Sequence, residues 1–274
     1  MTAYCSSPTT LRLETLDAAG TVTATLDLMD QANGYRVSSL DVGHPTVRDV
    51  IAPLPTRDGD YDSTRLYGPR SVTVAGSFIP STAGSRQKAL QALRWWCQPR
   101  LRPRVVYAVD SDCAPLWLAI RGSQLAAPMS NPAVSAFTVA WVAPDPVARA
   151  LTTQTATINP GATGTVTNAG TYRAWPVLDI YGPCTNPVVT WVTPAAGAVV
   201  FSGLTVASGH YVEVDTSAQT ALLDASPASS VYPSLDFHST RWAGLEPGVT
   251  SLSFTAGTSS SPARLVVKWA DSSI

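Results

Sequence analysis

Charged side chains are scarce in this sequence. Asp, Glu, Lys and Arg make up 14% of its 274 residues, and the formal net charge is only −1. Ordinary soluble domains carry about 25% charged residues. Nucleic acids and anionic membranes attract clustered Lys and Arg, so this balance argues against both as partners. A surface with so few charges suits a protein that is largely covered by other proteins.

Long apolar runs are missing as well. No run approaches the ~20 residues that a transmembrane helix needs. Residues 1–8 contain neither the basic start nor the apolar centre of a secretory signal. We therefore expect no membrane insertion, and we expect the chain to fold in the cytoplasm of the cell that makes it.

The residues and motifs that enzymes use are few. Neither the histidines nor the cysteines form an H-E-x-x-H or C-x-x-C arrangement, and structural disulfides are not the favoured interpretation. No G-x-S-x-G, G-x-G-x-x-G or P-loop pattern is present. The sequence thus predicts no enzyme, no cofactor and no metal, with an unfamiliar active site as the alternative. The scattered residues are His44, His210, His238, Cys5, Cys97, Cys113 and Cys184.

A polar loop from Pro53 to Tyr67 has one feature of a calcium site. Aspartates alternate at its centre, as hard oxygen ligands would. The pattern then fails, because an EF-hand loop needs Gly and Glu where this sequence has Ser63 and Pro69. We interpret the segment as a solvated loop or as a contact with a neighbouring subunit. Its candidate interface residues are Arg57, Asp58, Asp60, Asp62 and Arg65.

Short alternating segments between Gly and Pro residues predict a mostly β protein. Residues 11–15 and 21–26 indicate a hairpin around Asp17–Gly20, and residues 71–79 indicate a half-buried strand. Residues 85–97 are instead rich in helix formers, and their apolar stripe should pack on a sheet. The stripe consists of Ala89, Leu90, Leu93, Trp96 and Cys97.

The chain is long enough for two domains. Pro144 and Pro146 end the first run of strands, so we place a β-sandwich-like domain with one helix at residues 1–149. Thr152 to Gly170 is poor in large apolar residues and suits a linker or an edge strand. Residues 150–274 predict a second β-sandwich. Its candidate strands are 175–180, 187–192, 198–201, 211–215, 252–254 and 265–269.

Carbohydrate binding by the second domain is the alternative function. Sugar sites on β-sandwiches combine a Trp platform with nearby polar side chains. His238, Arg241 and Trp242 supply these residue types close together, but the H-x-N-x-R and W-x-x-E spacings of galectins are absent. The simpler interpretation is that Trp242 covers the core of the domain.

Several short motifs follow one another in an order that points to one family. They are Gly34–Val37, Gly68–Gly76, Trp175–Pro187, Tyr211–Thr216 and Leu245–Phe254, together with the polar loop and the single helix. In this order they resemble the distal tail proteins (Dit) of siphophages, also described as minor tail proteins. One departure is Thr250, where the family's pattern has Asn after the Pro-Gly turn.

The resemblance implies a structural protein of the virion without catalytic residues. Such a protein forms a homo-hexameric ring between the tail tube and the distal hub or baseplate, around the DNA conduit. The N-terminal domain would form the ring, and the C-terminal domain would be a galectin-like β-sandwich. The implied partners are the tail tube protein, the tail hub or tail-associated protein, the tape measure protein, and receptor-binding or fibre proteins. The implied location is the distal end of the phage tail, after assembly in the host cytoplasm.

Overall fold

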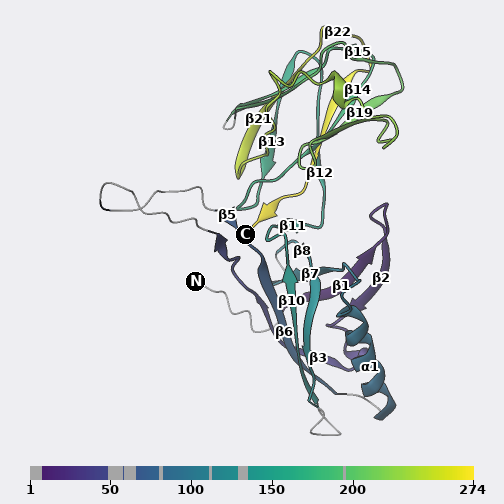
Figure 1. Ribbon diagram of the computed structural model, residues 1–274, viewed down its shortest axis with the longest axis vertical. Coiled ribbons are helices and arrows are strands. Elements are labelled where there is room, and N and C mark those ends of the chain that lie inside the picture. The colour runs from purple at the N-terminus through teal and green to yellow at the C-terminus, as the bar shows by residue number, and fades with distance from the viewer. Residues whose placement is uncertain are drawn as a thin grey trace. The chain divides into compact units, whose positions relative to one another are not determined.

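The structure is a computed structural model, and it describes residues 8–48, 58, 66–79, 83–110, 113–128, 135–193 and 196–274. Strands hold 54% of the residues and helices 6%, which confirms the predicted β-rich class. The chain separates into two compact units, Met1–Leu151 with Ile274 and Thr152–Ser273 (Figure 1). Among the described helices, none is long and apolar enough to cross a membrane.

Two antiparallel sheets and one α-helix build the first unit. Within this unit one sheet runs in the order β2-β1-β7-β8-β11 and the other in the order β3-β6-β10-β9, while β4 and β5 form a separate short ladder. A single 3₁₀ turn, η1 (Gln31–Asn33), precedes β3. The strands are β1 (Thr10–Leu16), β2 (Val22–Asp27), β3 (Tyr35–Val42), β4 (Val47–Arg48), β5 (Leu66–Tyr67), β6 (Arg70–Phe78), β7 (Arg104–Ala108), β8 (Leu116–Ala119), β9 (Arg121–Ala126), β10 (Ser135–Ala143) and β11 (Ala148–Ala150).

The predicted first hairpin is confirmed as β1 paired with β2. Its turn depends on Asp17, whose carboxylate accepts backbone N–H bonds from Ala19 at 2.9 Å and from Thr21 at 2.8 Å. Gly20 completes the reversal with a φ of 81°, a conformation that L residues rarely adopt. The turn chemistry read from the sequence is therefore the chemistry that closes the hairpin.

The predicted helix is α1 (Ala83–Trp96), which begins and ends slightly earlier than the expected 85–97. The predicted apolar stripe is buried in the core of the first unit, with Cys97 half-buried just beyond the helix. The Tyr35 hydroxyl donates a hydrogen bond of 3.0 Å to the Ala89 carbonyl and so ties α1 to β3. Burial raises the pKa of Tyr35 to about 12, so this donor keeps its proton at neutral pH.

The second unit is a β-sandwich. One sheet has the order β12-β23-β14-β19-β20, the second β13-β21-β16-β17, and a small third sheet β18-β15-β22. A single hydrophobic core takes residues from both large sheets, as two packed sheets require. The elements are β12 (Gln154–Ile158), β13 (Ala162–Asn168), β14 (Val177–Tyr181), β15 (Cys184–Thr185), β16 (Val188–Thr193), β17 (Gly197–Val200), β18 (Thr205–Val206), β19 (Tyr211–Asp215), β20 (Thr220–Leu223), η2 (Tyr232–Ser234), β21 (Gly248–Thr255), β22 (Thr258–Ser259), β23 (Arg264–Trp269) and β24 (Ser272–Ser273).

The segment Thr152 to Gly170 forms edge strands rather than a linker. β12 pairs with β23 and β13 pairs with β21, so two consecutive strands join different sheets of the sandwich. The change of sheet occurs at Gly161, whose φ is 79°. All six strands predicted for this half are present, whereas β20 and the two-residue strands β15, β18, β22 and β24 were not predicted.

The end of α1 lies unusually close to β9. A Cβ atom added at Gly122 would stand 2.7 Å from the Cα of Cys97, and real Cβ atoms do not approach backbone this closely. Because backbone atoms on both sides are held by secondary structure, neither can move aside cheaply. Gly122 therefore sets the distance between the helix end and the sheet.

We expect Gly122→Ala to lower the free energy of unfolding by about 1–3 kcal/mol, because the added methyl group overpacks this contact. Urea denaturation followed by circular dichroism measures the change. Gly257→Ala is the matched control, because its new Cβ would lie 3.4 Å from Thr185 Oγ1, an ordinary contact. Equal stabilities of the two variants would contradict the assignment of Gly122 as a packing constraint.

Candidate functional site

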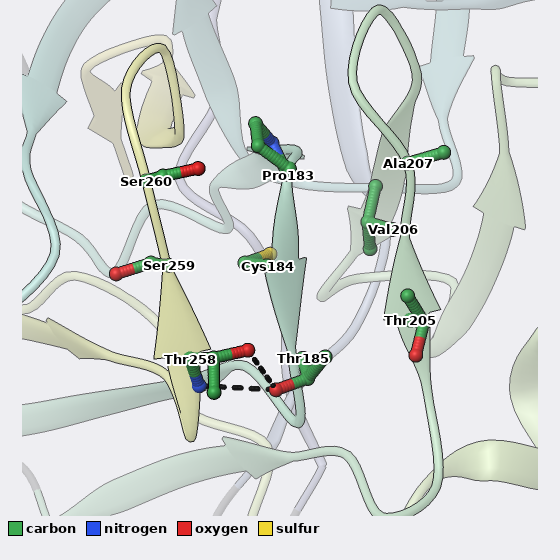
Figure 2. Close-up of a pocket in the computed structure, with 9 residues that line it drawn as sticks. All are labelled: Pro183, Cys184, Thr185, Thr205, Val206, Ala207, Thr258, Ser259 and Ser260. Atoms are coloured by element: carbon green, nitrogen blue, oxygen red, sulfur yellow. Dashed lines mark hydrogen bonds between the residues drawn. The ribbon is translucent and has the colours of Figure 1, made fainter.

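A hollow of about 350 Å³ lies over the small sheet of the second unit. In Figure 2, Thr185 of β15 lies between Thr205 of β18 and Thr258 of β22. The two hydroxyls of Thr185 and Thr258 are 2.7 Å apart, and the Thr258 backbone N–H donates to Thr185 Oγ1 at 3.0 Å. The full lining is Pro183, Cys184, Thr185, Thr205, Val206, Ala207, Thr258, Ser259 and Ser260.

This hollow can form hydrogen bonds but cannot move protons. Its lining contains hydroxyls and one thiol, and no carboxylate, imidazole or amine. Burial raises the pKa of the Cys184 thiol, so the reactive thiolate is disfavoured at neutral pH. The hollow therefore lacks the chemistry of an active site.

One ion pair in the second unit has the geometry of a catalytic dyad. His210 Nδ1 lies 2.7 Å from Asp224 Oδ2, and the hydrogen bonds from His210 and from the Tyr211 backbone N–H lower the pKa of Asp224. Both side chains are exposed, and no described hydroxyl or thiol hydrogen-bonds the other ring nitrogen. Without a nucleophile the pair is a surface contact between the residue before β19 and the residue after β20.

The buried carboxylate of Glu14 in the first unit also has a structural role. The Glu14 carboxylate is buried on β1 and receives Arg12 Nε at 2.6 Å and Arg104 Nε at 2.7 Å. Burial alone would raise the pKa of this carboxyl, but the hydrogen bonds and charges of both arginines outweigh it and hold the pKa below its usual range. The cluster joins β1 to β7 across the sheet. Within the described ranges, no group of three His, Cys, Asp or Glu side chains is placed to hold a metal ion.

The candidate interface loop lies between β4 and β5 in the sequence. Of its five predicted residues only Asp58 is described, and it is exposed, whereas Arg57, Asp60, Asp62 and Arg65 lie outside the described residues. The ladder of β4 and β5 pairs Val47 with Tyr67 and Arg48 with Leu66. Val47 and Leu66 are 51% and 55% exposed, and the register places them on opposite faces of this ladder. We call its three apolar residues, Val47, Leu66 and Tyr67, the apolar stem.

The three predicted sugar-contact residues all lie within the described residues. Trp242 is partly buried and packs against the core of the sandwich, as the simpler interpretation expects. His238 and Arg241 are exposed, and the Arg241 backbone pairs with Ala198 at the edge of β17. The three residues do not line the hollow over β15, the hollow beside Pro262 or the hollow beside Tyr232.

Sequence reasoning missed a pair of exposed aromatic rings, Tyr232 and Phe237. Their ring centroids are 5.2 Å apart, and the side chains are 37% and 58% exposed. The available signal was the presence of two aromatic residues within the polar stretch 226–241, which also holds the predicted His238. Trp242 was the candidate platform residue instead, because tryptophan is the usual platform of sugar sites.

Comparison with known proteins gives matches only among solved structures. No family model matches the sequence, and no curated protein matches it. The structure of SPP1 Dit (gp 19.1), described as a paradigm of the hub adsorption apparatus in phages that infect Gram-positive bacteria, aligns with a TM-score of 0.69. The alignment covers 96% of this chain and 98% of SPP1 Dit at 12% identity. The chain has the distal tail protein fold.

Two structures of the phage P2 baseplate in its activated conformation, with Ca and with Sr, align less closely. Their TM-scores are 0.48 and 0.47, each at 10% identity over 94% of this chain and 97% of the other. The resemblance stated from short sequence motifs is thus confirmed for the fold across both units of the chain.

We expect Glu14→Gln to destabilise the protein by about 1–3 kcal/mol at neutral pH, because it leaves two arginines without their buried partner. The lowered pKa means that the charged form of Glu14 stabilises the fold above its unfolded-state pKa, about 4.3, and that this stabilisation is lost as the pH falls through the lower folded-state value. The difference between wild type and variant should therefore shrink in acid. Denaturant titrations across the pH range in which both remain folded measure it.

The control for this experiment is Glu246→Gln. Glu246 receives Arg173 Nε at 2.6 Å, but both side chains are about one-third to one-half exposed. An exposed pair of this kind contributes at most about 1 kcal/mol. If the stability difference between wild type and Glu14→Gln stayed constant down to acid pH, the negative charge of Glu14 would not be what stabilises the fold.

Proposed function

We propose that this chain is a non-enzymatic structural protein of a phage tail tip. It forms a hexameric ring that connects the tail tube to the distal hub or baseplate and surrounds the DNA conduit. The observation that carries the proposal is the similarity to SPP1 Dit, which extends over nearly the whole of both chains. A match of this extent includes both units and their order, so it does not rest on a common β-sandwich alone.

The proposed partners follow from a position between tube and tip. They are further copies of the chain in a homo-hexamer, the tail tube protein, the tail hub or tail-associated protein, the tape measure protein, and receptor-binding or fibre proteins. The proposed location is the distal end of the tail in the virion, after assembly in the host cytoplasm. The low charge of the sequence supports this role, because a ring subunit covers surfaces on both flanks and on both faces.

The apolar stem supports a contact between neighbouring subunits. A cyclic ring uses two different surfaces of each subunit, so a projecting element on one flank can meet a receiving surface on the other. The stem offers Val47 and Leu66 to solvent in the free subunit, and burying such side chains stabilises association. The predicted interface residues Arg57 to Arg65 lie in the sequence between the two strands of this stem.

The chemistry of the described residues agrees with a role without catalysis. The exposed dyad has no nucleophile, the hydroxyl-lined hollow has no base, and the buried carboxylate Glu14 is held by two arginines. The alternative function, a carbohydrate- or receptor-binding module, finds support in one observation, the exposed aromatic pair. It is compatible with the ring, because the two functions use different residues.

Electron microscopy of the purified chain, with mass photometry on the same sample, tests the ring. We expect particles of six subunits closed around a channel. A persistent monomer, dimer or trimer at micromolar concentrations, both alone and with a tail tube protein, would contradict the hexamer.

Paired substitutions test the stem. We expect Val47→Ser with Leu66→Ser to leave the unfolding temperature nearly unchanged and to shift hexamers towards monomers, because an exposed apolar contact matters only in the assembly. Val192→Ser with Val249→Ser is the matched control, since these residues of the second unit are 53% and 60% exposed. Loss of hexamers in the control, or none in the stem variant, would exclude the stem as the contact.

A further inference from the structure

The exposed aromatic pair is held outwards by the backbone around it. Tyr232 begins η2, and the Leu235 backbone N–H donates to the Tyr232 carbonyl at 3.0 Å. Leu235 itself is buried and bridges Phe201, while the Asp236 N–H bonds to the Val200 carbonyl at 2.8 Å. The chain is thus anchored between the two aromatic residues, and the rings stay at the surface although Leu235 between them enters the core. Two large rings kept in solvent by an anchored backbone indicate a binding surface.

A small hollow of about 260 Å³ is lined by Tyr232 of the pair, but not by Phe237. Residues of β20 line it as well. No charged side chain lines the hollow, which combines apolar groups with hydroxyl and amide groups. Its volume is slightly below the usual range of small-molecule sites, about 300–1,000 Å³. The lining consists of Gln219, Thr220, Ala221, Leu222, Ser230 and Tyr232.

The register of β19 and β20 places two carboxylates on the sheet face that Thr220 and Leu222 share. Leu222 stands opposite Glu213, and Thr220 stands opposite Asp215. Ala221 between them is buried, so Thr220 and Leu222 are on the outer face of the sheet together with Glu213 and Asp215. On the strands beyond, the same face carries Arg264 and Asp179, which is buried and paired with Lys268. None of these charged groups lines the hollow.

We infer that Tyr232, Phe237 and the hollow over β20 bind a neutral glycan. A pyranose ring presents an apolar C–H face and a rim of hydroxyls, which matches aromatic rings beside hydroxyl and amide groups. The lining holds no cation that would bind a phosphate, sulfate or uronate group. The hollow takes one or two sugar residues, and the rest of a longer glycan lies outside it. This inference identifies the residues of the alternative function and does not depend on the ring.

The assignment differs from the one that residue types alone suggest. Trp242 packs on the core and offers no free face of comparable exposure, whereas Phe237 is the most exposed aromatic residue of the described ranges. His238 follows Phe237 directly, and its backbone N–H is bound to Asp236 Oδ1 at 3.0 Å. The inferred site therefore includes the stretch of sequence around His238, but Tyr232 and Phe237 replace Trp242 as the aromatic platform.

Saturation-transfer NMR and titration calorimetry on the full chain test the inference. The probes are maltotriose, triacetylchitotriose and lactose as neutral glycans, and heparin as an anionic one. We expect saturable binding of at least one neutral probe, with saturation transfer from aromatic protons. Phe237→Ala and Tyr232→Ala should each weaken that binding by about tenfold or more, and Phe237→Tyr should retain it, because the aromatic face is what the sugar contacts.

Two controls keep the outcome specific. Val249→Ala removes an apolar side chain of similar exposure from the other sheet and should bind as wild type. Trp242→Phe should also bind as wild type if the platform is Tyr232 and Phe237. Circular dichroism melts of each variant establish that a loss of binding is not a loss of fold.

The inference is overturned if no neutral probe binds saturably, if Phe237→Ala and Tyr232→Ala bind as wild type, or if heparin binds this site more tightly than the neutral probes. It is also overturned if the aromatic variants instead lose hexamers, since the pair would then be a subunit contact. Mass photometry of the same samples separates the two proposals. Binding without hexamers refutes the ring alone, and hexamers without binding refute the glycan site alone.

Discussion

The second unit depends on main-chain hydrogen bonds that cover the outer strands of its two sheets. Residues 229–241 bond along β20 through Ser230 and Val231, and along β17 through Leu235 and Arg241. One segment therefore satisfies backbone groups at the edge of both sheets, where unpaired groups would be costly. The same bonds fix the position of the aromatic pair. The binding surface and the closure of the sandwich thus have a common structural cause.

The sequence predicted those strands, helices and turns whose local residue pattern matches the burial and contacts that the fold gives them. Residues 71–79 alternate polar and apolar side chains, and β6 buries that apolar face in the middle of its sheet. The helix was predictable because its apolar stripe and its helix formers coincide. The turn at Asp17 was predictable because its chemistry is local. Thr152 to Gly170 was ambiguous, since strands at an edge bury too little to show a clear alternation.

Other features could not be predicted, because distant parts of the chain create them. β15 has two residues and exists through pairing with β18 and β22, which are far from it in sequence. The hollow beside Tyr232 needs the register of β20, and four residues lie between Tyr232 and Phe237 without specifying the angle between their rings. Residue type made Trp242 the candidate platform, whereas the simpler interpretation placed it over the core, and its partial burial against the core agrees with the latter. Contact and exposure, rather than composition, decide which aromatic residues are available.

Both units leave strand edges without a partner. No described strand pairs with the outer sides of β2 and β3 in the first unit or of β12 and β13 in the sandwich, whereas the β20 and β17 edges of the sandwich are bordered by residues 229–241. Main-chain pairing with a neighbour is thus open at the first set of edges, and recognition beside residues 229–241 falls to side chains. Side-chain surfaces change by single substitutions, while main-chain pairing does not depend on side-chain identity. A lineage carrying this chain could alter what the second unit recognises without changing how the first unit assembles.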